Sequence, residues 1–235
     1  MQANRCTTIK QFTIAASLIS ASLAAPSAFA ADDAASTAPP VMAATATPGY
    51  AGNGALHAGD WLVRLRAISI EPAARTTETL SALNVGVNNA IVPELDFTYM
   101  IRDYLGVELI LATSRHQVTS SLGNLGGVGV LPPTILLQYH FNHQGRIRPY
   151  VGAGFNYTLF YNNGLNAGGQ SISIDNHSFG PAVQAGVDVQ ITKRLYLNAD
   201  IKKIWMKTGA SLNGQSLGTL HIDPLVVGLG VGMKF

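Results

Sequence analysis

Strict two-residue periodicity across residues 132–161 restricts the fold more than any other feature of the chain. Two alternating runs, residues 132–141 and 147–161, are separated by the short polar stretch 142–146. Because successive side chains of a strand point to opposite faces, the pattern predicts a hairpin with one wholly apolar side. Each arm has about ten residues or more, which is the length of a tilted strand that crosses a bilayer. The apolar side consists of Ile135, Leu137, Tyr139, Phe141, Val151, Ala153, Phe155, Tyr157, Leu159 and Tyr161.

The N-terminus has the pattern of a secretory signal peptide. Arg5 and Lys10 precede an apolar run over residues 12–23, and Ala28-Phe29-Ala30 matches an A-x-A cleavage site. We expect residues 1–30 to be a signal peptide that is removed after Ala30. The alternative, a membrane anchor, fits less well because the run is short and is interrupted at Pro26.

Composition excludes several classes of function for the mature chain. Cys6 is the single cysteine and lies in the signal, so no disulfide, thiolate metal ligand or cysteine nucleophile is predicted. Without Arg5 and Lys10, 13 basic residues oppose 13 acidic residues, and no basic tract occurs. Nucleic acid is therefore not an expected partner, and no cofactor or metal is predicted.

Eight alternating segments organise the remainder of the sequence. Residues 31–58 are rich in Ala, Thr and Pro without periodicity, and we expect a flexible periplasmic tail. Within residues 59–235 the connections between segments are alternately long and short, which is typical of outer-membrane barrels with tight periplasmic turns and long extracellular loops. We predict an all-β protein, an eight-stranded antiparallel transmembrane β-barrel. The segments are 61–69, 90–101, 105–114, 132–141, 147–161, 179–191, 195–206 and 225–235.

Short motifs along nearly the whole mature length resemble the OmpW family of small outer-membrane barrels. The motifs are residues 59–64, 93–99, 106–109, 132–134, 138–141, 149–154, 156–158 and 223–224, together with the terminal Phe235. The resemblance implies an integral protein of the Gram-negative outer membrane that passes small hydrophobic molecules. It also implies that the last strand, which ends at Phe235, is recognised by the barrel-assembly machinery.

Charged residues on the inward faces of the segments lie near the predicted periplasmic ends. An unpaired buried charge is strongly disfavoured, so these residues are expected to pair and to plug the narrow lumen. The predicted plug comprises Arg64, Arg66, Glu94, Asp96, Glu108, Asp188, Asp200 and Lys202. Arg148 and Lys234 share this level and bring the set to five acidic and five basic side chains.

Inward residues nearer the extracellular end are apolar. They predict a pocket suited to small hydrophobic solutes rather than to hydrated ions. The alternative is that these side chains fill the small barrel and leave no cavity. The predicted pocket residues are Ile68, Val92, Ile110, Leu136, Phe160, Ile204 and Met206.

Prolines in the upper part of the predicted strands suggest a lateral exit. Proline has no N–H for the strand ladder, so clustered prolines weaken a barrel wall. A solute stopped by the plug would leave through this seam into the membrane. The alternative is that the prolines only mark strand ends. The predicted seam residues are Pro93, Pro132, Pro133 and Pro224.

The apolar inward residues above the charged set favour uptake of small hydrophobic molecules. A surface receptor or structural barrel with an inert lumen is the alternative. Enzymatic activity is not predicted, because Gly214-x-Ser216-x-Gly218 lies between two predicted strands rather than at the strand-to-helix turn that a nucleophile elbow requires.

His140 and His143 flank a short turn and are expected to be polar turn residues. Lys203 falls on the lipid-facing side and should lie near an interface.

Overall fold

The computed structural model describes residues 54–235. The predicted signal peptide, residues 1–30, and most of the predicted tail lie outside the described residues. In the part of the chain that is described, no helix has the length and apolar character needed to cross a membrane.

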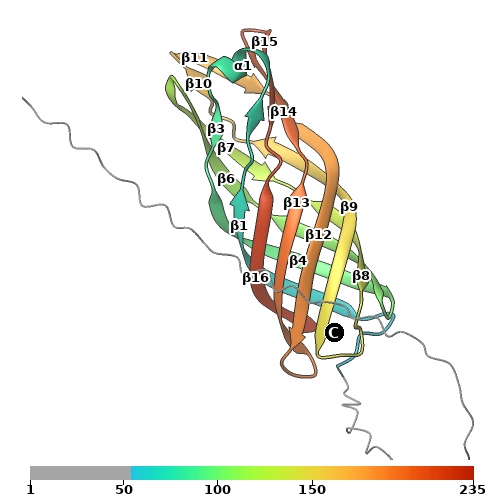
Figure 1. Ribbon diagram of the computed structural model, residues 1–235. Helices are drawn as coiled ribbons and strands as arrows, with labels where there is room; N and C mark the ends of the chain where they lie inside the picture. Colours follow the sequence, from blue (N-terminus) through green and yellow to red (C-terminus); the bar gives the residue numbers. More distant parts are fainter. Residues whose placement is uncertain (1–53) are drawn as a thin grey trace, which may run out of the picture. The chain divides into compact units, whose positions relative to one another are not determined.

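Eight long strands form a closed antiparallel barrel (Figure 1). Each strand pairs with its neighbour in chain order, and β16 returns to pair with β1, so the sheet closes into a cylinder. The predicted fold is therefore confirmed, and every predicted segment overlaps one barrel strand. The strands are β1 (Trp61–Glu71), β4 (Ala90–Arg102), β5 (Leu105–Ala112), β8 (Thr134–His140), β9 (Ile147–Tyr161), β12 (His177–Gln190), β13 (Leu195–Ile204) and β16 (Leu225–Lys234).

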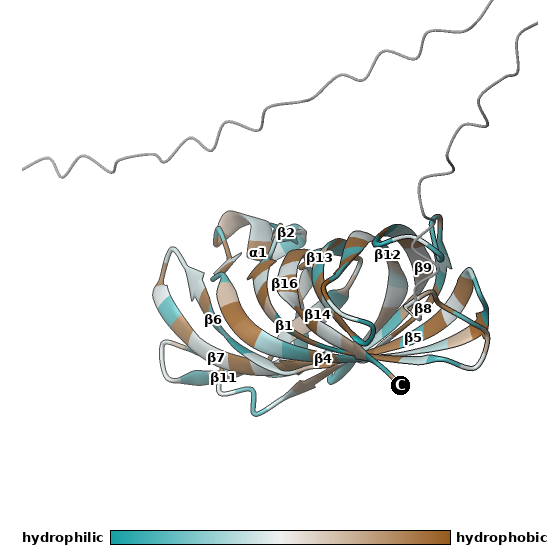
Figure 2. Ribbon diagram, turned by 90° about the horizontal axis from the view of Figure 1, so that it is seen from below, coloured by the Kyte–Doolittle hydropathy of each residue, from teal (hydrophilic) through white to brown (hydrophobic). Residues whose placement is uncertain are grey.

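Exposed and buried side chains alternate along each barrel strand. Apolar and polar residues alternate along the same ribbons in Figure 2. The exposed side chains are mostly large and apolar, as in Leu65, Phe155 and Leu229. Soluble proteins rarely expose so much contiguous apolar surface, so this exterior is suited to lipid.

The two ends of the barrel differ in structure. At one end, which we call the turn end, tight turns join β4 to β5, β8 to β9 and β12 to β13. The first and last strands also meet there, since the Trp61 amide donates to the Phe235 carbonyl at 3.2 Å and the Phe235 amide donates to the Trp61 carbonyl at 2.9 Å.

The opposite end, which we call the loop end, contains additional strands that the sequence patterns did not predict. β6 and β7 continue the wall above β5 and β8, and β14 and β15 continue it above β13 and β16. These segments were expected to be loops, because they are rich in Gly and Ser and lack an apolar outer face. The elements are β2 (Arg75–Thr76), α1 (Glu78–Ala82), β3 (Gly86–Val87), β6 (Ser114–Ser120), β7 (Gly123–Leu131), β10 (Asn166–Ala167), β11 (Gln170–Ile174), β14 (Lys207–Leu212) and β15 (Gln215–His221).

Residues 54–58, the end of the predicted tail, pack into the turn end of the barrel. Leu56 is fully buried against Leu62, Met100 and Tyr196, and its amide donates to the carbonyl of His143 at 2.9 Å. For these five residues the structure differs from the expected flexible tail, because Leu56, the one large apolar side chain among them, finds an apolar recess at the mouth of the barrel.

Candidate functional site

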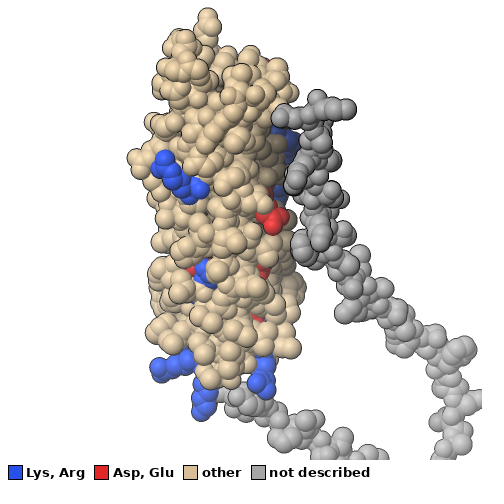
Figure 3. All heavy atoms as spheres, turned by 90° about the vertical axis from the view of Figure 1, so that its left-hand side faces the viewer, with Lys and Arg blue, Asp and Glu red and all other residues tan. Residues whose placement is uncertain are grey.

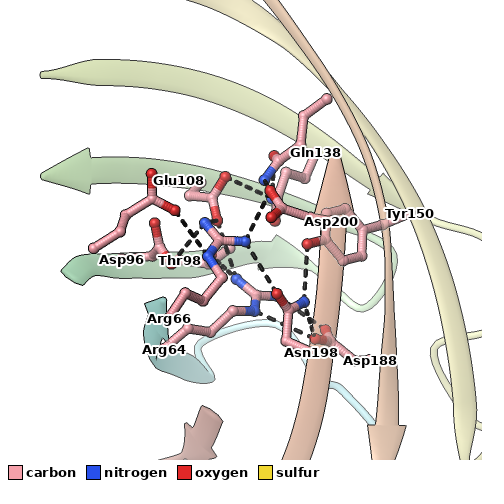
Figure 4. A network of polar contacts seen from close by, with 12 residues as sticks. Arg64, Arg66, Asp96, Thr98, Glu108, Gln138, Tyr150, Asp188, Asn198 and Asp200 are labelled. Atoms are coloured by element: carbon pink, nitrogen blue, oxygen red, sulfur yellow. Dashed lines mark hydrogen bonds and ion pairs between the residues drawn. The ribbon is translucent and has the colours of Figure 1, made fainter. Parts of the chain in front are cut away.

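Two arginines of β1 organise a polar network inside the turn-end half of the barrel. Their guanidinium groups lie among carboxylates from the facing strands (Figure 4). Arg64 contacts Asp188 at 2.9 Å and Glu108 at 3.2 Å. Arg66 reaches three further carboxylates, at 2.9 Å to Glu94, 2.6 Å to Asp96 and 3.0 Å to Asp200. Since β1 side chains at even positions point inward, a single strand supplies both cations.

Lys202 completes the network on β13. Its ammonium group lies 2.6 Å from Glu94 and 3.0 Å from Asp200. All eight charged residues predicted for the plug are buried, and each belongs to this set of contacts. We call these eight residues the ion-pair plug.

Uncharged side chains that the sequence patterns did not single out link the members of the plug. Gln138 donates to Glu108 at 2.7 Å, and Gln184 donates to Asp200 at 2.7 Å. Asn198 donates to both Asp188 and Tyr150. Strand alternation predicts that these amide side chains point inward. It does not predict which residue each of them contacts.

Arg148 and Lys234, the two remaining inward cations, turn toward the N-terminal segment instead of joining the plug. Arg148 donates to the Gly54 carbonyl at 2.9 Å, and Lys234 donates to the Ala55 carbonyl at 2.7 Å. The plug therefore contains five carboxylates and three cations. The structure divides the expected neutral set of ten residues into two groups. Arg148 and Lys234 are drawn away by backbone carbonyl acceptors of residues 54–55, whose position the sequence patterns did not predict.

Above the plug, the predicted apolar residues separate into two clusters. The lower cluster contains five of the seven predicted pocket residues, with Val92 packed against it. The upper cluster contains Phe160 and is otherwise built from loop-end residues such as Val118, Leu125 and Leu165. Sequence reasoning missed these because their segments were expected to be loops, although the short alternation at Ile172 and Ile174 was a usable signal. The five shared residues are Ile68, Ile110, Leu136, Ile204 and Met206.

Two cavities lie in line along the barrel above the plug. The upper cavity has a volume of about 70 Å³ and an apolar lining that includes Leu125, Phe160 and Leu220. The lower cavity has a volume of about 40 Å³ and rests on Glu94 and Lys202 of the plug. Val130 and Met206 line both cavities and so form the partition between them.

The barrel wall is interrupted beside the lower cavity. Pairing of β4 with β5 ends at Glu94 and Ala112, immediately after Pro93. Pairing of β5 with β8 ends at Ile110 and Thr134, and pairing of β6 with β7 resumes only at Ser114 and Val130.

Three of the four predicted seam prolines surround this interruption. Thr113 at its centre belongs to no strand pair, while Pro93 lies on one side of it and Pro132 and Pro133 lie on the other. Pro224 is not brought to the same place. It lies before β16, three strands from β5, where its carbonyl accepts a bond from the Ile204 amide at 3.2 Å.

The other candidate groups lie in separate places within residues 54–235. No group of three His, Cys, Asp or Glu side chains in this range is arranged to hold a metal ion. His140 is not a turn residue as expected but is buried in the lumen, 5.2 Å from the Tyr150 ring. Ser216 lies in β15 of a hairpin rather than at a strand-to-helix turn.

Comparison with known proteins gives a consistent result. The family model of the OmpW family matches residues 57–235. The outer-membrane protein y4mB of Sinorhizobium fredii is 36% identical over 216 residues, which cover 85% of this chain and 87% of the relative. The Dibenzothiophene metabolism operon protein PahQ of Pseudomonas aeruginosa is 31% identical over 156 residues, which cover 63% of this chain and 72% of the relative.

A solved structure extends the likeness to three dimensions. The crystal structure of the outer membrane protein OprG from Pseudomonas aeruginosa superimposes with a TM-score of 0.71 at 29% sequence identity, covering 78% of this chain and 99% of that chain. The fold, the family model and the relatives all indicate an outer-membrane barrel. In such barrels the tight turns are periplasmic and the long loops are extracellular, so the turn end is the periplasmic end and the loop end is the extracellular end. This chain belongs to the OmpW family and is an integral β-barrel of the outer membrane.

Proposed function

We propose that this protein takes up small hydrophobic molecules at the cell surface and releases them sideways into the outer membrane. The observation that carries the proposal is the order of the lumen, in which apolar cavities lie directly above a buried ion-pair plug. An apolar guest gains free energy from leaving water for such cavities, whereas entry into the plug would require separating buried charges. In this proposal the protein acts as a channel and not as an enzyme.

The partition between the cavities is the proposed gate. An engineered cavity of about 150 Å³ holds benzene, so both cavities must widen for a guest of that size. Met206 is unbranched and can change rotamer at low cost, which makes it the natural moving part. Val130, by contrast, is stiff and sets the width of the passage.

The proposed exit is the interruption around Thr113. Ala112 and Ser114, the residues on either side of Thr113, line the lower cavity. A guest there is separated from lipid by a stretch of wall that lacks ladder hydrogen bonds and is bridged by side chains, with the Thr113 and Tyr161 hydroxyl groups 2.6 Å apart. The name of the PahQ relative, which refers to metabolism of an apolar aromatic compound, supports this class of solute.

Filling the partition tests the proposal. Val130→Phe places a large ring between the cavities, and Val183→Phe makes the same change on the outer face of β12, where Val183 is exposed. In vesicles that contain the purified protein, we expect Val130→Phe to slow uptake of naphthalene severalfold. Val183→Phe should behave like the unmodified protein, and uptake of a hydrophilic sugar should stay at the level of protein-free vesicles throughout.

The competing function, a receptor or structural barrel with an inert lumen, predicts a different result. In that case vesicles with the unmodified protein would take up naphthalene no faster than protein-free vesicles. Equal rates for Val130→Phe and the unmodified protein would also refute passage through the partition.

A further inference from the structure

Basic side chains form a row on the outer surface near the extracellular end of the barrel. Lys207 of β14 pairs with His221 of β15, which pairs with Arg75 of β2. Residues directly opposite in antiparallel strands project from the same face of the sheet. Lys203 lies on the same outward face four residues before Lys207, because Lys203, Trp205 and Lys207 alternate with the buried residues Ile204 and Met206.

The height of this row matches the outer boundary of the apolar band. β13 begins at Leu195 at the periplasmic end. A strand rises about 3.3 Å per residue, and barrel strands tilt by roughly 40°, which places Lys203 about 20 Å and Lys207 about 30 Å above Leu195. The lipid-facing band of such barrels is about 25 Å tall. The two lysines therefore bracket the level of the outer-leaflet head groups.

Below the row the surface is apolar, and other charged groups are sparse. Ile201 of β13 and Val227 of β16 are exposed beneath Lys203. Trp205 and Phe179 add aromatic surface at the boundary, and the Trp205 amide donates to the Pro181 carbonyl at 3.0 Å, which holds these residues on adjoining strands. On another face, Figure 3 likewise shows few charged atoms over the middle of the wall and Lys and Arg atoms gathered at its lower end.

The basic groups are available to an external anion. The Lys207 ammonium group has no polar partner among the described residues, and the residue is exposed. The Arg75 side chain is 74% exposed and uses one nitrogen to contact buried Asp223 at 3.0 Å. The Lys203 ammonium donates to the Asp223 carbonyl. Asp223, which Arg75 and Lys203 both contact, is buried, and Glu71 lies across β16 from Lys203, since both pair with Leu225. The row keeps a positive charge after these contacts.

We propose that Lys203, Lys207, His221 and Arg75 bind the phosphate groups of a phosphorylated glycolipid of the outer leaflet. Lysine binds phosphate as a point charge, and arginine adds directed hydrogen bonds. The acyl chains of the same lipid lie along Ile201, Trp205 and Phe179. A lipid that satisfies both halves of this surface has an anionic head and several chains, as lipopolysaccharide does.

Native mass spectrometry of the purified full-length barrel tests the site with defined lipids. We expect bisphosphorylated lipid A to bind, and lipid A stripped of its phosphates to bind at least about tenfold more weakly, since each charge-assisted hydrogen bond contributes about a tenfold factor. Lys207→Gln should weaken binding of bisphosphorylated lipid A by a similar factor, and Lys203→Gln with Lys207→Gln should weaken it further. Added salt should reduce binding to the unmodified protein.

Lys193→Gln is the matched control, because it removes one exposed positive charge from the periplasmic turn between β12 and β13. It should bind lipid A as the unmodified protein does. Equal affinity for phosphate-free lipid A, equal affinity for phosphatidylglycerol, displacement by millimolar inorganic phosphate, or unchanged binding by Lys207→Gln would each overturn the proposal. Lys207→Gln leaves the fold intact, since the ammonium it removes has no partner within the described chain.

Discussion

At the scale of single residues, Arg66 has the most demanding environment in the barrel. Its guanidinium contacts Glu94, Asp96 and Asp200, and Asn198 accepts a further bond at 3.1 Å. Burying a charge is unfavourable unless its partners are complete, and here each nitrogen of the guanidinium has an acidic partner. A planar donor with several N–H groups suits this arrangement better than lysine would.

Arg66→Leu should therefore strongly destabilise the barrel. The substitution leaves buried carboxylates without their cation. We therefore expect the free energy of unfolding to fall by about 3–5 kcal/mol. Urea-induced unfolding in lipid vesicles measures this loss. Arg194→Gln, on an exposed turn, should change the free energy of unfolding by less than about 0.5 kcal/mol. A stability of Arg66→Leu equal to that of Arg194→Gln would show that the plug is not held by this residue.

At the scale of strands, the interruption at Thr113 distinguishes one side of the barrel. β4 keeps its register with β1 through residues 90–93, so only its other edge lacks a partner there. The Pro132 carbonyl accepts bonds from Asn156 at 3.1 Å and Thr134 at 3.0 Å. The wall is thus bridged toward β9 and lacks backbone pairing toward β5 and β6, which gives the proposed exit a definite position.

Adding backbone N–H donors at the interruption should close the barrel wall there. In the variant with Pro93→Ala, Pro132→Ala and Pro133→Ala, new N–H groups can enter the ladder, each contributing about 0.5–1.5 kcal/mol. We expect slower naphthalene uptake and slower amide hydrogen exchange at residues 111–115. Pro149→Ala is the control, because Pro149 lies in β9, which pairs on both sides at that level. Slower exchange with unchanged uptake would contradict a lateral exit while leaving the structural role of the prolines in place.

At the scale of the whole molecule, stability depends on closing β16 against β1. Ten residue pairs join these strands, from Leu62 with Lys234 to Glu71 with Leu225. Gly230 lies in the middle of this contact, where an added Cβ would come within 2.1 Å of the Leu65 carbonyl oxygen and 2.6 Å of the Arg66 Cα. The glycine leaves room for both the neighbouring backbone and the arginine of the plug.

Gly230→Ala should impair closure of the cylinder. Overpacking commonly costs about 1–3 kcal/mol, and contact with backbone atoms places this site at the upper end, about 3 kcal/mol or more. Gel mobility of unheated samples and urea unfolding report the folded fraction. Gly164→Ala is the matched control, since nothing lies within 4 Å of its added Cβ. Equal folded fractions for the two variants would show that β1 and β16 can separate to accommodate the methyl group.

Much of the architecture follows from the sequence alone. Leu65, Phe155 and Leu229 must be apolar because each faces lipid whichever strand lies beside it, so the two-residue pattern survives in every barrel strand. Arg64, Glu94 and Asp188 were assigned to the plug for a related reason, since an inward charge near the periplasmic end has no alternative to burial. Such constraints act on one residue at a time, and local sequence records them.

The tertiary structure alone decided which residues meet. The pairing of Arg66 with Asp200, the diversion of Arg148 to Gly54 and the row of Lys207, His221 and Arg75 depend on register between strands far apart in sequence. The extracellular strands lie above the hydrocarbon core and need no continuous apolar outer face, so apart from the alternation at Ile172 and Ile174 their part in lining the upper cavity left no periodic signal. Alternation specifies the face on which a side chain lies, but only closure of the cylinder specifies its neighbour.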